Sequence, residues 1–260
     1  MVTRGIIALS VLAACAAGAA DVAVGPAVVY GSPVEERALA YNGPPGLEVW
    51  EVKRDFAYGL SGVAERAPFE LAAGAAYFSA AEGRDNAYSI EDLRENGWSA
   101  GVDFKYVHNA PPLNAALRTE YGRAETEYDE VPAPGATPFS TATTRYTCEY
   151  YSVAATVGPR FEPWGRLRLD LSVGPGLKIV RRDGESYGRR LYVGYEARPI
   201  GYKDRLVEFH YVGECTVPVT GRFALQLSVA GIPRLAEPRD QYPADDGHRF
   251  YAEVSPRFTF

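Results

Sequence analysis

The stretch His248-Arg-Phe-Tyr-Ala-Glu-Val-Ser-Pro-Arg-Phe-Thr-Phe260 alternates between apolar and polar residues. Successive side chains of an extended chain point to opposite faces, so the alternation predicts a β-strand with one apolar face and one charged face. The apolar face would carry Phe250, Ala252, Val254, Phe258 and Phe260, and the other face Arg249, Glu253, Arg257 and Thr259.

A final strand that ends on a C-terminal Phe, with aromatic residues at every second position, resembles the closing strand of bacterial outer-membrane β-barrels. Phe258 and Phe260 carry this signature. The resemblance implies contact with outer-membrane lipid and recognition of the C-terminal strand by the barrel-assembly machinery. It covers only these last residues, so the remaining chain has to supply the other strands.

Alternation recurs along the whole chain and predicts an all-β fold, an antiparallel transmembrane up-and-down β-barrel of about ten strands. Twelve strands become possible if a small ribbon at residues 191–197 pairs into the sheet, and the full range is 8–12. The segment at 145–158 alternates less cleanly and is expected to contain a bulge. The ten predicted strands are residues 21–30, 50–64, 69–77, 98–106, 113–121, 145–158, 166–173, 207–217, 223–229 and 248–260.

The connections between these segments alternate between short and long. Tight turns on one side of a membrane and longer loops on the other produce such a pattern. A final strand that descends to the periplasm places every short turn in the periplasm and every long loop outside the cell, provided that residues 21–30 form the first strand. The predicted extracellular loops are residues 31–46, 80–96, 127–143, 181–203 and 233–247.

Periodicity alone also fits a soluble, lipocalin-like barrel with its apolar residues inward. The near balance of charges on the polar face favours the opposite polarity, because charges of both signs can pair across a narrow lumen. Trp50, Trp98 and Trp164 lie at predicted strand ends, where aromatic girdles form. The predicted lumen charge network comprises Asp103, Lys105, Arg118, Glu120, Arg166, Arg168, Asp170, Glu208, His210, Glu214, Arg222, Arg249, Glu253 and Arg257.

Length and composition favour one domain that is exported. The 260 residues have a formal net charge of -6 with no basic stripe, which disfavours a nucleic-acid partner. Residues 1–20 are typical of a signal peptide, which leaves 21–260 as a single barrel domain. The tract ending at Cys15 also resembles a lipoprotein lipidation motif, so this cysteine is either lipidated or lost with the signal.

No catalytic, cofactor or metal motif is present in the sequence. The histidines at 108, 210 and 248 lack metal-ligand spacing, and no phosphate loop or nucleophile elbow occurs. Cys148 and Cys215 fall on predicted strands that are separated by a third strand. Strands lie about 4.8 Å apart, so the two Cα atoms exceed the bridging limit of about 7 Å, and both thiols are predicted to be free.

Ten strands with this order of loops also resemble the omptin proteases, which use an Asp-x-Asp pair in one loop and an Asp-x-His pair in another. The matching stretches here are Glu82-Gly-Arg-Asp-Asn86 and Arg182-Asp-Gly-Glu185, which lack those pairs. Asp246-Gly-His248 has the spacing but lies before the last strand, where the family does not place it. A His-x-Ser pair, expected for a lipid A deacylase, is absent from the sequence.

The sequence therefore favours a non-enzymatic, monomeric outer-membrane barrel whose function lies in its surface loops. Opacity-type and adhesion barrels are the nearest analogy. A narrow porin-like role, an omptin-like protease and a soluble secreted barrel are the alternatives. No feature of the loops identifies an extracellular ligand.

Overall fold

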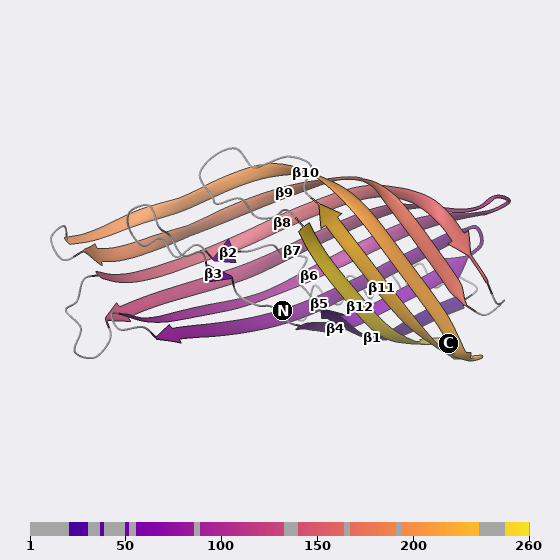
Figure 1. Cartoon of the computed structure of the whole chain (residues 1–260), viewed down its shortest axis with the longest axis horizontal. Helices are drawn as coiled ribbons and strands as arrows, with labels where there is room; N and C mark the ends of the chain where they lie inside the picture. The colour runs from indigo at the N-terminus through magenta and orange to yellow at the C-terminus, as the bar shows by residue number, and fades with distance from the viewer. Residues whose placement is uncertain are drawn as a thin grey trace.

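The computed structural model describes residues 21–30, 37–38, 50–51, 56–85, 89–132, 140–163, 167–190, 194–233 and 248–259. Ten antiparallel strands close into a barrel in the order β1-β12-β11-β10-β9-β8-β7-β6-β5-β4 (Figure 1), which confirms the predicted fold class. The barrel strands are β1 (Asp21–Tyr30), β4 (Phe56–Arg66), β5 (Phe69–Asp85), β6 (Ser89–Asn109), β7 (Pro112–Pro132), β8 (Ser140–Phe161), β9 (Arg168–Arg190), β10 (Gly194–Thr220), β11 (Phe223–Pro233) and β12 (His248–Thr259).

The first and last strands close the barrel. Val28 of β1 pairs with Val254 of β12 on one side and with Tyr58 of β4 on the other. Two short strands, β2 (Arg37–Ala38) and β3 (Trp50–Glu51), pair with each other outside the barrel sheet. The predicted strand 50–64 is therefore wrong at its start, since the barrel strand begins at Phe56. Three consecutive charges at 53–55 interrupt the alternation there.

Apolar side chains face outward from the barrel and polar or small ones face inward. On β7, Leu113 and Leu117 are exposed, whereas Asn114 between them is 2% exposed. The closing strand follows the same rule, with Phe258 exposed and Arg257 buried. A soluble barrel buries its apolar residues inside. The structure has the polarity expected of a barrel in lipid.

The outward apolar surface forms a band of limited height. On β8 it runs from Phe161 up to Tyr151, both exposed, and the next outward residue is Glu149. On β7 it runs from Leu113 to Tyr121, and Arg123 follows. Ten residue steps of about 3.3 Å, tilted by about 40°, span roughly 25 Å. That height matches the lipid-facing band of outer-membrane barrels, about 25 Å.

Six strands continue well past this band. β5 to β10 are 17–27 residues long, whereas β1, β4, β11 and β12 have 10–12 residues. The long strands project beyond the ends of the short ones at the left of Figure 1. We call this part the extension. It consists of the portions of β5–β10 at the end of the barrel opposite the short turns. On each strand it starts beyond one residue, in the order Tyr77, Trp98, Tyr121, Tyr151, Ile179 and Val207.

The extension corrects three of the predicted loops. Residues 80–96, 127–143 and 181–203 are mostly strand, with undescribed residues only at 86–88, 133–139 and 191–193. Outside lipid an outward position need not be apolar, so the alternation that identifies a membrane strand ends while backbone pairing continues. The predicted loops 31–46 and 233–247 lie almost wholly outside the described residues.

Two local predictions were also wrong. The ribbon at 191–197 does not add strands, because β9 and β10 pair without interruption from Thr216↔Arg168 to Gly194↔Arg190. No bulge occurs in the described part of β8, whose register to β9 is constant from Ser140↔Arg190 to Phe161↔Leu169. The irregular pattern on β8 arises because Tyr146 and Tyr150 face the interior and are buried.

Candidate functional site

The half of the lumen nearest the short turns is crossed by a cluster of buried charges. Arg160 of β8 donates to Asp170 of β9 with both Nε and Nη2, at 2.7 and 2.8 Å. The same Nη2 donates to Glu70 of β5 at 2.8 Å. Lys105 Nζ of β6 lies 3.3 Å from Asp170 Oδ2 and also pairs with Glu214 of β10. Apart from Arg160–Asp170, which joins the neighbouring strands β8 and β9, these contacts join strands that are not neighbours in the sheet.

Two further arginines extend the cluster. Arg118 of β7 pairs with Asp103 at 2.9 Å and with Glu214 at 2.7 Å. Arg168 of β9 pairs with Glu65 of β4 at 3.1 Å. Every strand from β4 to β10 thus contributes a charged side chain. Buried charges are stable only when they are paired, so the cluster ties these seven strands together across the lumen.

A second group of inward polar residues lies on the extension side of the cluster. Tyr150 donates its hydroxyl to Glu120 at 2.7 Å, and Lys178 Nζ lies 4.3 Å from the centre of the Tyr150 ring. His210 lies 3.2 Å from Glu208, which is 1% exposed. Next to them is a buried apolar cluster formed by Ala57, Phe78, Ala124, Cys148, Tyr150, Val180 and Leu206.

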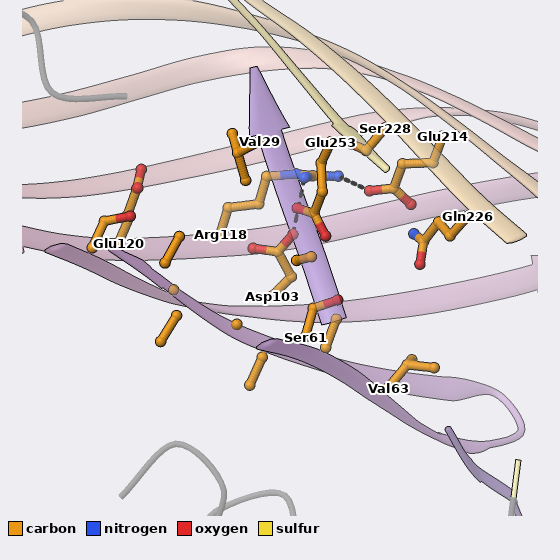
Figure 2. A pocket seen from close by; sticks show the side chains of 18 of the residues that line it. Val29, Ser61, Val63, Asp103, Arg118, Glu120, Glu214, Gln226, Ser228 and Glu253 are labelled. Carbon is orange, nitrogen blue, oxygen red and sulfur yellow. Dashed lines mark hydrogen bonds and ion pairs between the residues drawn. The ribbon is translucent and has the colours of Figure 1, made fainter. Parts of the chain in front are cut away.

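A cavity of about 200 Å³ lies beside the charged cluster (Figure 2). One wall consists of small residues on β4 and β5, including Ala72, Gly74 and Ala76. Arg118, Asp103 and Glu214 lie on another side. The remaining wall comes from β11 and β12 and is formed by Gln226, Ser228, Glu253 and Arg257.

Comparison with solved structures identifies the fold. No family model matches the chain, and neither does any curated protein. The translocator domain of the autotransporter NalP from Neisseria meningitidis matches with a TM-score of 0.51 at 11% identity, over 99% of this chain and 96% of that domain. The chain has the outer-membrane β-barrel fold.

Two other outer-membrane barrels match with lower scores. The ferric yersiniabactin uptake receptor FyuA from Yersinia pestis has a TM-score of 0.44 at 13% identity, over 78% of this chain and 32% of its own. The protease OmpT from Escherichia coli has a TM-score of 0.40 at 10% identity, over 92% of this chain and 95% of its own. The chain thus spans about a third of the length of FyuA. At these identities the likeness concerns the fold alone.

Within this outer-membrane barrel most of the predicted network residues lie inside the lumen, but not all of them join the cluster. Arg222 is exposed on the turn between β10 and β11, and its backbone N–H donates to Thr220 Oγ1 at 3.3 Å. Glu253 and Arg257 line the cavity. Arg166, the side chain of Arg249 and the terminal Phe260 lie outside the described residues.

The sequence pattern missed two inward cations of the barrel. Arg160 falls in a segment predicted to be a turn, and Lys178 lies beyond the end of a predicted strand. Even-numbered residues face the lumen on both strands, as Thr156 does on β8 and Asp170 on β9. Arg160 and Lys178 are even-numbered too and therefore face inward. Continuing the alternation of inward and outward residues past the predicted strand ends would have identified both cations.

The barrel brings together no omptin-like constellation at the described positions. Asp183 and Glu185 of β9 are exposed and face outward, away from the lumen. Among the described residues no group of three His, Cys, Asp or Glu side chains has metal-binding geometry. In the same part of the chain, no helix is long and apolar enough to span a membrane. Cys148 on β8 and Cys215 on β10 are free thiols, with β9 between them.

Proposed function

We propose that this chain is an outer-membrane barrel with a closed lumen that presents its extension to a partner at the cell surface. The observation that carries this proposal is the unequal length of the strands. β5–β10 continue far beyond the apolar band at one end of the barrel only. A barrel that served only to span the bilayer would need strands of about 9–11 residues.

The closed lumen argues against a porin. About eight strands just enclose side chains and 16–18 leave an aqueous channel, so ten strands leave little space. Here the cluster around Lys105, Arg118 and Arg160 spans that space with cross-lumen ion pairs. Function is therefore assigned to the surface of the barrel and not to its interior.

The extension offers a rigid polar surface. Its outward face carries ion pairs between neighbouring strands, such as Arg145 Nε to Glu127 Oε1 at 2.8 Å and Arg123 to Glu149 at 3.5 Å. Paired strands hold such side chains in fixed positions, as loops without secondary structure do not. A surface with charges of both signs suits recognition of a polar partner, because complementary charges give specificity.

The orientation of the barrel in the membrane follows from the difference between its two ends, one with short turns and one with the extension. The short turns would face the periplasm and the extension the cell exterior, with the apolar band in outer-membrane lipid. In this proposal residues 1–20 direct export of the chain. The barrel-assembly machinery then recognises β12 and inserts the barrel as a monomer.

Adhesion of whole cells tests the proposal. Cells that display the chain are compared with cells that display a variant lacking residues 183–201, with Arg182 and Tyr202 joined by Asn-Gly; these two residues are partners in the β9–β10 register. We expect the shortened variant to lose binding to host cells while remaining in the outer membrane. Arg222→Ala, on the opposite end of the barrel, serves as the matched control.

Heat-modifiable gel mobility shows whether each variant is a folded barrel in the membrane fraction. Wild-type chain that stays soluble and shows no mobility shift would contradict the membrane assignment. Equal adhesion after shortening of the β5–β6, β7–β8 and β9–β10 hairpins together would contradict the role of the extension.

A further inference from the structure

The seam where β1 and β12 close the barrel contains two prolines that face each other. The register is constant along this seam, with Val28 opposite Val254. It places Pro26 opposite Pro256. Neither the two prolines nor the residues next to them form ladder pairs across the seam. In the described part of the chain, no other register pair consists of two prolines. The sheet is therefore interrupted in the middle of its closing seam.

The two prolines occupy positions whose backbone groups point across the seam. Thr259 N–H donates to Arg222 O at 2.9 Å, on the β11 side of β12. Backbone groups of successive residues in an antiparallel strand point alternately to its two neighbours. Those of even-numbered residues of β12, including Pro256, therefore point to β1. Proline has no N–H, so both hydrogen bonds that this residue pair would exchange are absent.

A buried serine replaces part of the missing ladder. Ser255 of β12 is 0% exposed, and its hydroxyl donates to Pro26 O of β1 at 3.0 Å. Its Oγ also lies 2.7 Å from Ser61 Oγ of β4. Backbone polar groups within lipid need partners inside the protein. The serine side chain therefore supplies the carbonyl of Pro26 with the donor that the facing proline lacks.

The barrel wall is thin at this interruption, and the cavity lies directly behind it. Gly25 faces inward, and a Cβ there would overlap Pro256 O, so the two backbones are in contact. Ala27 of β1 and Arg257 of β12 both line the cavity. Pro26, between Gly25 and Ala27, is exposed on the outward face. The two strands alone separate the cavity from lipid here.

We propose that this interruption is a lateral window, which opens between β1 and β12 and connects the cavity with the surrounding lipid. Opening the wall at an intact ladder would leave backbone N–H groups without partners in lipid, which is costly. Between Val24 and Val28 the seam has no ladder pair to lose, and the prolines have no N–H to leave unsatisfied. Among the described hydrogen bonds, the opening breaks the one from Ser255 to Pro26. The window spans four residue steps, about 13 Å along the strands.

Thiol labelling of the cavity from the lipid phase tests the window. Ser228 of β11 lines the cavity, so Ser228→Cys places a reporter thiol there, in a chain with Cys148 and Cys215 replaced by Ala. The folded full-length barrel in phospholipid bilayers is treated with N-phenylmaleimide, which dissolves in lipid, or with a charged maleimide, which does not. We expect the lipid-soluble reagent to label the thiol at least about tenfold faster, because a charge is excluded from the bilayer core.

Variants of the seam should change that rate in opposite directions. Pro256→Val supplies the missing N–H and suits a strand, so we expect labelling by N-phenylmaleimide to be about fivefold slower, the effect of one hydrogen bond. Ser255→Ala removes the serine hydroxyl and should make labelling about fivefold faster. Pro175→Val, at an exposed outward position of β9 that does not line the cavity, is the matched control and should leave the rate unchanged. Heat-modifiable mobility shows that each variant is folded, and Pro256→Val decides the matter if Ser255→Ala does not fold.

Equal labelling rates with and without Pro256→Val would overturn the proposal, since the reagent then reaches the cavity by another route. A folded barrel whose reporter thiol does not react with N-phenylmaleimide would overturn it too. Both results leave the role proposed for the extension untouched, because β1 and β12 do not belong to the extension.

Discussion

Replacement of Arg160 by Met probes the charged cluster at its most heavily bonded residue. Arg160 is 8% exposed and makes three hydrogen bonds of 2.7–2.8 Å to Asp170 and Glu70. Arg160→Met removes the charge and the donors but keeps an unbranched side chain. The two carboxylates then remain buried with fewer partners. Breaking a buried pair in this way costs about 3–5 kcal/mol.

Lys105 sets where in that range the result should fall. In the variant its Nζ stays 3.3 Å from Asp170 and 3.9 Å from Glu70, so it still neutralises part of the negative charge that Arg160 no longer balances. We therefore expect a loss near the lower end, about 3 kcal/mol in the free energy of unfolding. That loss is roughly two orders of magnitude in the unfolding equilibrium constant.

Urea titration of the folded barrel in micelles, followed by tryptophan fluorescence and extrapolated linearly, measures this loss. Arg181→Met is the matched control, because Arg181 pairs with Asp183 at 2.6 Å but both side chains are more than half exposed. Exposed pairs contribute little, so the control should lose less than about 1 kcal/mol. If Arg160→Met lost no more stability than Arg181→Met, the cluster would not stabilise the barrel.

Three further results are expected. Leu117→Arg, within the apolar band, should cost about 2–4 kcal/mol of stability in lipid, whereas Glu125→Arg, on the exposed outward face above it, should be within about 0.5 kcal/mol of wild type in the same titration. Gly122→Leu should lower the free energy of unfolding by about 1–3 kcal/mol, because a Cβ there would lie 2.1 Å from the Tyr150 ring, which its hydrogen bond to Glu120 holds in place. The same urea titration measures this loss, and an unchanged midpoint would contradict the packing. Planar-bilayer recordings of the wild type should show no large, stable unitary currents, and such currents would contradict the closed lumen.

The sequence predicted those parts of the strands that lipid constrains. Outward positions within the membrane are predominantly apolar, so residues 113–121 alternate and their strand could be recognised from the sequence. Ten strands, their outward faces and the closing role of residues 21–30 followed from that rule. Beyond the band the outward residues of β7 are Arg123, Glu125 and Glu127, and the sequence alone then resembles a charged loop.

The lumen was predictable in composition but not in pairing. Even-numbered charges on β9 and β10 indicated inward positions, yet cross-lumen partners such as Arg160 and Glu70 are 90 residues apart in the chain. Only the closed sheet brings them together. The bulge predicted in β8 was wrong because Tyr146 and Tyr150, which disturb the alternation of apolar and polar residues, fill the interior.

Thiol labelling on intact cells tests most directly whether the extension lies outside the cell. A membrane-impermeant maleimide is applied to Asp183→Cys and to Arg222→Cys, each in a background with Cys148 and Cys215 replaced by Ala; both labelled positions are exposed, at opposite ends of the barrel. We expect Asp183→Cys to react on intact cells and Arg222→Cys only after lysis. Labelling of Arg222→Cys on intact cells, with Asp183→Cys protected, would show that the extension points into the periplasm and would contradict the proposed role.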